Sequence, residues 1–137
     1  MNRNDLKVLA ALRLQEAKVL LNKRLYDGAY YLTGYAVECG LKSCIAKKTR
    51  RYDFPDRRIV NDSYTHDLNQ LIKVSGLQAE LALEMQRDRA FDVNWALVKD
   101  WNEGSRYERH DRAAAKSLYA AVADDKHGVF KWLKHHW

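Results

Sequence analysis

Three side chains near residue 106 are of the types that bind and cleave a phosphodiester. Arg106, Arg109 and His110 belong to a stretch, residues 101–110, that is dense in polar and aromatic residues. An arginine can neutralise the charge that develops on phosphorus, and a histidine can move protons to or from the 2′-hydroxyl and the leaving oxygen. The alternative is a helix start at which these side chains only cap and solvate, and the residue types alone favour it.

A cluster of basic residues between positions 47 and 58 is the second candidate. Tyr52 and Phe54 lie among the positive charges, and only Asp53 and Asp56 interrupt them. Arginines beside aromatic rings can hold phosphates and stack on bases. A solvated loop that keeps the protein soluble is the alternative. The members of this basic cluster are Lys47, Lys48, Arg50, Arg51, Arg57 and Arg58.

Two more side chains, His66 and Glu38, are candidates for a polar site. We expect His66 in the first turn of a helix that Thr65 caps, where it could contact a nucleotide or a partner. A structural role, with the ring packed against the bundle, is the favoured alternative. Glu38 precedes Lys42 by four residues, so the two form either a surface ion pair or a polar site in which Glu38 is buried beside tyrosines. The spacing alone does not distinguish these two arrangements.

Several familiar chemistries are missing from the sequence. It contains no glycine-rich phosphate loop, no Gly-x-Ser-x-Gly or His-Glu-x-x-His motif, and no Cys/His spacing typical of zinc sites. On one helix, Cys39 and Cys44 point about 140° apart, which fits neither a disulfide nor a shared metal. The adjacent His135 and His136 cannot clamp one ion and are expected in a solvated tail. We therefore expect no metal, no cofactor and two buried or half-buried free thiols.

The composition predicts one all-α domain spanning residues 1–137. Only six glycines and one proline are present, and β-branched runs are almost absent, which argues against sheets. The longest apolar stretches fall short of the ~18 residues that a membrane span needs, and the polar N-terminus lacks a secretory signal. We therefore expect a cytoplasmic protein with no membrane association. The net charge of +6 favours an anionic partner such as nucleic acid or a nucleotide.

Apolar periodicity predicts an up-and-down helical bundle of about five helices. The segment 28–48 is apolar around most of its circumference, so we expect it at the centre of the bundle and in a dimer interface. Gly34 and Gly40 in this segment would let another helix backbone approach closely. Residues 26–28 are the expected break before it. The other helices are expected at about 5–23, 63–76, 77–89 and 111–133, the last bent near Gly128, with a short helical or turn segment over 91–101 and an irregular stretch over 49–64.

Three separate segments also form a family pattern. Residues 26–42, YDGAYYLTGYAVECGLK, look very like the first conserved helical block of the HEPN family (higher eukaryotes and prokaryotes nucleotide-binding domain). Residues 64–68 match its Thr-His-Asp-Leu element, and Trp101 followed by Arg106-Tyr107 matches its later Trp…Arg-Tyr element. With the helix pattern, the chain resembles this family over roughly residues 10–135. The first block is quite specific, and the two shorter elements follow in the right order.

The resemblance implies an up-and-down helical bundle that usually dimerises and has a link to RNA or nucleotides. Many members are metal-independent endoribonucleases, often toxins or phage-defence factors, and many are encoded beside a minimal nucleotidyltransferase. The active ones carry an Arg followed, after four to six residues, by a His, in a site shared across the dimer. Here only three residues separate Arg106 from His110, and Tyr107 replaces the polar residue that usually follows the Arg. On a helix the pair would still lie one turn apart, as a contracted site.

Two functions follow as hypotheses. In the first, the protein is a HEPN-type dimer that binds a nucleotide, RNA or a nucleotidyltransferase partner, in a toxin–antitoxin or defence context. In the second, it is a metal-independent endoribonuclease in which Arg106 stabilises charge and His110 is the acid or base. The departures from the family pattern favour the first. A third, structural possibility is that the protein only holds the nucleotidyltransferase. The expected binding residues are His66, Arg106, Tyr107, Arg109 and His110 with the basic cluster.

Overall fold

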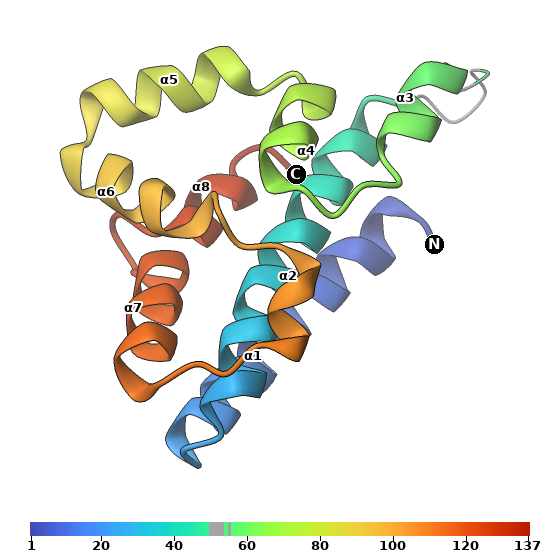
Figure 1. The fold of residues 1–137 in the computed structure, drawn as a ribbon. Coiled ribbons are helices and arrows are strands. Elements are labelled where there is room, and N and C mark those ends of the chain that lie inside the picture. The colour runs from blue at the N-terminus through green and yellow to red at the C-terminus, as the bar shows by residue number, and fades with distance from the viewer. Residues whose placement is uncertain (50–53, 55) are drawn as a thin grey trace.

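The computed structural model describes residues 1–49, 54 and 56–137, and these form eight α-helices and one short 3-10 helix, with no strand among them (Figure 1). The predicted all-α fold is therefore confirmed, with more and shorter helices than the five expected. Residues 50–53 and 55, which include Arg50 and Arg51 of the basic cluster, lie outside the described residues. The helices are α1 Arg3–Asn22, α2 Tyr26–Lys47, α3 Arg57–Asp62, α4 Leu68–Ser75, α5 Gln78–Arg87, α6 Arg89–Val98, the 3-10 helix η1 Glu103–Tyr107, α7 Arg112–Ala123 and α8 Val129–Lys134.

Helices α1 and α2 form a long antiparallel hairpin whose turn comes earlier than the sequence predicted (Figure 1). The turn spans residues 23–25, and Arg24 has a left-handed φ of 62°. The expected break at residues 26–28 is therefore wrong. Gly28 instead lies inside α2, where a Cβ atom would come within 3.1 Å of Leu20 Cδ1 on the neighbouring helix. A glycine that looked like a helix breaker thus allows close packing within the hairpin.

Helix α2 lies at the centre of the fold, as its apolar circumference predicted. It packs against α1, α4, α7, α8 and η1, and most of its residues between Ala29 and Ile45 are buried. The close neighbour of Gly34 is the ring of Trp101, and that of Gly40 is the side chain of Leu133. These glycines therefore admit side chains rather than the backbone of another helix. Because the chain itself covers α2, the apolar surface of this helix no longer indicates a dimer interface.

Helices α3, α6 and α7 begin at aspartate caps, and two of them, α3 and α6, lie in segments that were expected to be irregular or a short helical or turn segment. Asp56 caps α3, Asp88 caps α6 and Asp111 caps α7, each through a side-chain oxygen that accepts a backbone N–H. The expected last helix is two helices, α7 and α8, separated by a turn that ends at Gly128. Gly76 ends α4 in a left-handed conformation, as predicted. Within the described ranges, no helix has both the length and the apolar character needed to cross a membrane.

The two cysteines are free and buried, as predicted. Burial raises the pKa of both thiols to about 11, so each stays protonated and unreactive near neutral pH. We expect iodoacetamide at about pH 8 to modify neither Cys39 nor Cys44 in the folded protein, and to modify both after unfolding in urea. Mass spectrometry of the intact chain counts the adducts. Rapid alkylation of either thiol without denaturant would contradict this expectation.

Candidate functional site

The three sequence segments that carry the HEPN resemblance contribute side chains to one side of α2. The first segment belongs to α2 itself, and the other two pack against it. Trp101 covers Gly34 so closely that an added Cβ would come within 2.2 Å of the indole ring. Helix η1 follows Trp101 and packs on α2, as the orange segment in front of the cyan helix shows (Figure 1). From the second segment, His66 reaches Glu38. We call this surface the motif face; it consists of Tyr31, Tyr35, Glu38, Lys42, His66, Trp101, Glu103, Arg106 and Tyr107.

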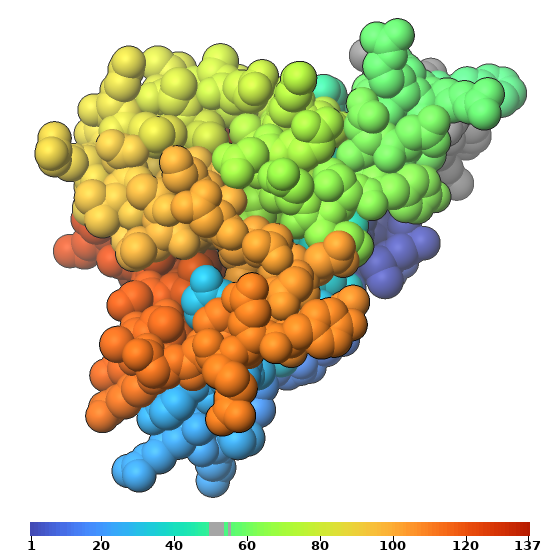
Figure 2. All heavy atoms as spheres, viewed as in Figure 1, coloured from blue at the N-terminus to red at the C-terminus, as the bar shows by residue number. Residues whose placement is uncertain are grey.

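The part of the motif face that η1 contributes can be followed by its colour in the space-filling view. In Figure 2 the orange atoms of residues 100–110 cover α2 between the green atoms of the α4 region and the blue end of the α1–α2 hairpin. Residues far apart in the sequence therefore form one continuous surface.

Four ionisable side chains form a connected row within the motif face. The Glu38 side chain is buried, with 3% exposed, and its two oxygens lie 2.9 Å from His66 Nδ1 and 3.3 Å from Lys42 Nζ. The other ring nitrogen of His66, Nε2, lies 3.1 Å from Glu103 Oε2. The sequence left open whether Glu38 forms a surface ion pair or a polar site in which it is buried, and in the structure its carboxylate is buried.

Each ring nitrogen of His66 lies near a carboxylate oxygen. Both contacts are therefore attractive in only one charge state of the ring. A neutral imidazole carries only one N–H. The Nδ1–Glu38 contact is a hydrogen bond, and the Nε2–Glu103 contact is an ion-pair distance that is attractive when the ring is an imidazolium. In that state the row holds two positive and two negative charges. Because Glu38 belongs to α2 and Glu103 to η1, His66 ties η1 to α2.

His66 was expected in the first turn of a helix, but it lies in the link before α4. The cap of α4 is Asp67, and the Thr65 hydroxyl accepts the backbone N–H of Asp67 instead of capping the helix. The His66 side chain is 43% exposed and lines a surface cavity of about 530 Å³ between this link and residues 99–104. The ring is therefore held in place and still open to a ligand.

Arg106 and Tyr107 are both exposed on η1, beside aromatic residues of α2. The guanidinium carbon of Arg106 lies 4.9 Å from the centroid of the Tyr107 ring. Interactions with Tyr107, and to a smaller extent with the Tyr31 hydroxyl, raise the pKa of Arg106. The ring centroid of Tyr31 lies 6.0 Å from that of Tyr35 and 5.8 Å from that of Trp101. The motif face thus presents an exposed arginine beside a row of aromatic rings.

His110 does not lie beside Arg106 on a helix. The chain is extended directly after η1, so the expectation that the two residues lie one helical turn apart is wrong. The His110 ring stacks on Tyr30, with centroids 3.7 Å apart, and its Nε2 lies 3.2 Å from the carbonyl oxygen of Ser105. Only 11% of its side chain is exposed. The catalytic role of this pair stays a prediction, and this geometry does not favour it.

The remaining predicted binding residues lie away from the motif face. Arg109 pairs with Asp27 in the first turn of α2, with Nε and Oδ2 3.0 Å apart. Lys47 comes nine residues after Glu38, roughly 13 Å farther along the axis of α2. The described members of the basic cluster, at the end of α2 and in the first turn of α3, are all exposed: Lys47, Lys48, Arg57 and Arg58.

Sequence reasoning missed Glu103 as a member of the site. The signal that could have drawn attention to it is an acidic residue two positions after Trp101 in the polar, aromatic stretch. No local spacing, however, connects Glu103 to His66, which lies 37 residues earlier. Only the fold brings their side chains together.

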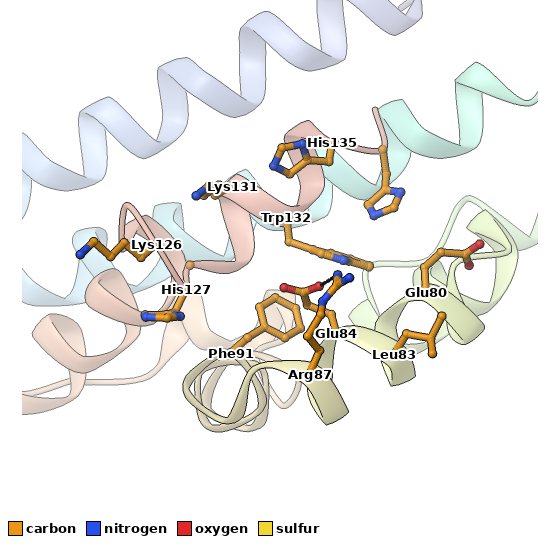
Figure 3. Close-up of a pocket in the computed structure, with 12 residues that line it drawn as sticks. Glu80, Leu83, Glu84, Arg87, Phe91, Lys126, His127, Lys131, Trp132 and His135 are labelled. Carbon is orange, nitrogen blue, oxygen red and sulfur yellow. Dashed lines mark hydrogen bonds and ion pairs between the residues drawn. The ribbon is translucent and has the colours of Figure 1, made fainter.

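A second cavity, of about 380 Å³, lies between α5 and α8 (Figure 3). The rings of Phe91 and Trp132 form its floor, with centroids 5.6 Å apart, and an Arg87–Glu84 ion pair lies beside them. His136 was expected in a solvated tail but lines this cavity; its ring is 4.7 Å from Trp132, and burial lowers its pKa. In the part of the chain that the structure describes, no group of three or more His, Cys, Asp or Glu side chains is placed to hold a metal ion.

Comparison of the chain with known protein families, with curated proteins and with solved structures finds no match. The resemblance to the HEPN family therefore rests on the three sequence segments alone and stays a prediction.

Proposed function

We propose that the protein is a HEPN-type domain that binds single-stranded RNA or a nucleotide, and that the motif face is its binding surface. One observation carries this proposal: the three segments that resemble the family, separated by 21 and 32 residues in the sequence, contribute side chains to one surface around Glu38 and His66. Segments that served only the packing of separate helices would have no reason to meet at an exposed surface.

The residue types of the motif face suit a flexible nucleic acid. Arg106 offers a charged group to a phosphate, and the exposed Tyr107 offers a ring on which a base can stack. His66 and Lys42 extend the polar surface along α2. Stacking and phosphate contacts of this kind depend little on the base sequence, so we expect the protein to bind single strands of many sequences. A homodimer and a nucleotidyltransferase partner in a toxin–antitoxin or defence context belong to the proposal through the resemblance alone.

Binding of a fluorescent single-stranded oligoribonucleotide, followed by anisotropy at low salt, tests the proposal. Tyr107→Ala should weaken binding by about 5- to 150-fold, which corresponds to the ~1–3 kcal/mol of one base–aromatic stack. Arg106→Ala should also weaken binding and reduce the slope of log K against log salt by about 0.7, because one phosphate contact is lost. Arg89→Ala, at an exposed arginine that begins α6, is the charge-matched control and should leave binding unchanged. Binding by both motif-face variants as tight as that of the control would refute the assignment.

Cleavage of the bound RNA is the second candidate function, and the placement of His66 favours it. The buried Glu38 lies behind Nδ1 and the ring is open to solvent, which are features of a histidine that transfers protons; Nε2 lies 3.1 Å from the half-exposed Glu103, whose carboxylate the RNA must displace first. The His66 side chain is 43% exposed and the His110 side chain 11%, so His66 is more accessible to RNA for proton transfer. The same oligoribonucleotide, incubated with the protein in EDTA, distinguishes the two candidates. Products that disappear in His66→Ala would support cleavage, and intact RNA would restrict the function to binding.

A further inference from the structure

A small cavity lined by positive charges lies at the turn of the α1–α2 hairpin. It has a volume of about 240 Å³ and lies between this turn and the start of α7. Three of its lining residues are cationic and none is acidic. The residues that line it are Leu21, Asn22, Arg24, Tyr26, Arg112 and Lys116.

The three cations of this cavity have no carboxylate partner in the described part of the chain. No described carboxylate oxygen lies within 4.0 Å of the charged nitrogens of Arg24, Arg112 or Lys116. Two acidic residues of adjoining segments are engaged elsewhere: Asp27 pairs with Arg109, and Asp111 accepts the backbone N–H of Ala114 as the cap of α7. Like charges around one cavity repel each other, and a bound anion would remove that repulsion.

Arg112 and Lys116 are four residues apart on α7 and therefore lie on one face of the helix, one turn apart. Arg24 comes from the opposite side, in the turn of the hairpin. A cation from the turn and two from α7 thus border the cavity together, with the Tyr26 hydroxyl and the Asn22 amide as further polar groups. Arginine presents several N–H groups in a plane, which suits the oxygens of a phosphate group.

The backbone of Arg24 supplies a second, independent observation. Its N–H donates to the carbonyl of Leu21, and the N–H of Leu25 donates to that of Leu20, the pattern that ends a helix with one left-handed residue. Arg24 is that left-handed residue, with φ of 62°, at a position where glycine is the usual and less strained choice. Arginine here carries backbone strain that glycine would avoid, and its charge both borders the cavity and complements the C-terminal end of the α1 dipole.

We propose that this cavity binds a phosphate group, held by Arg24, Arg112 and Lys116. The site is separate from the motif face: Tyr26 begins α2, and Glu38 follows twelve residues later, roughly 18 Å along the helix. It does not depend on the proposed RNA-binding function, because its ligand is either free phosphate or the terminal phosphate of an RNA or nucleotide.

Titration of inorganic phosphate into the full chain at low ionic strength, by calorimetry, tests the proposal. Arg24→Gly should lower phosphate affinity at least tenfold while the melting temperature without phosphate stays equal to that of the wild type or rises, because glycine relieves the left-handed strain. Lys116→Gln should lower the affinity in the same direction. Lys73→Gln, at an exposed lysine of α4, is the charge-matched control and should bind phosphate as the wild type does. Phosphate affinity that is absent, or unchanged in Arg24→Gly, would overturn the proposal.

Two oligoribonucleotides that differ only in a 5′-phosphate identify the source of the ligand. Tighter binding of the phosphorylated strand by the wild type, lost in Arg24→Gly, supports the site and identifies an RNA end. Equal binding of both strands, with phosphate affinity that depends on Arg24, supports the site with free phosphate as its ligand. Failure of both strands to bind at all would reject the RNA-binding function and leave the phosphate result to decide this site.

Discussion

Replacing Gly34 by alanine is expected to destabilise the protein by roughly 1–2 kcal/mol. The added Cβ would lie 2.2–2.3 Å from three atoms of the Trp101 ring, which is itself buried and rigid. Either the indole leaves its place or the segment before η1 moves away from α2. Overpacking of this kind costs about 1–3 kcal/mol and sometimes more. It outweighs the roughly 1 kcal/mol that alanine gains over glycine in a helix. Urea unfolding followed by tryptophan fluorescence measures the change.

Gly28→Ala is the matched control, since it places the same substitution in the same helix. Its added Cβ would meet only Leu20 Cδ1, at 3.1 Å, which is the mobile end of a flexible side chain. We expect its free energy of unfolding to stay within about 1 kcal/mol of the wild type. Equal stability of the Gly34→Ala and Gly28→Ala variants would mean that Trp101 does not pack on α2 as described.

Glu38→Ala is expected to lower the free energy of unfolding by about 2–3 kcal/mol. The carboxylate is buried and accepts contacts from both His66 and Lys42. Removing one partner of a buried pair usually costs about 3–5 kcal/mol, but here the two partners of Glu38 are partly exposed and regain water. The variant should also free the His66 ring, so its NMR signals should come to resemble those of an exposed histidine.

Glu16→Ala is the control for that substitution. Glu16 also forms a helical ion pair, with Arg13 at 2.6 Å, but its side chain is 40% exposed. Exposed pairs of this kind contribute about 0–1 kcal/mol, so we expect little change. If Glu38→Ala were no more destabilising than Glu16→Ala, the buried carboxylate would not hold the motif face together.

The fold class could be predicted from the sequence because it depends on composition and on periodicity within single segments. The central position of α2 and the end of α4 at Gly76 follow from such local signals. The start of α2 could not be predicted, because Arg24 takes the left-handed conformation that a glycine usually marks. The short helices α3 and α6 begin at Asp56 and Asp88, and these caps were readable signals that the apolar pattern had outweighed.

The candidate site was only partly predictable, for a different reason. His66, Arg106 and Tyr107 stood out by residue type, and all three lie on the motif face. The residues that these side chains contact are distant in the sequence. Glu38 lies 28 residues before His66, and the Tyr30 ring that covers His110 lies 80 residues before that histidine. Helical spacing relates residues within a few turns and says nothing about such distances.

Residue-resolved NMR during titration with a short single-stranded oligoribonucleotide tests the central claim most directly. The claim predicts that the backbone amide signals of residues 31–42, 64–68 and 101–107 shift together, along with the indole N–H of Trp101. The signals of α5 and α8, which border the cavity of Figure 3, should stay in place. Shifts confined to α5 and α8, or no shifts at a saturating concentration of RNA, would contradict the account.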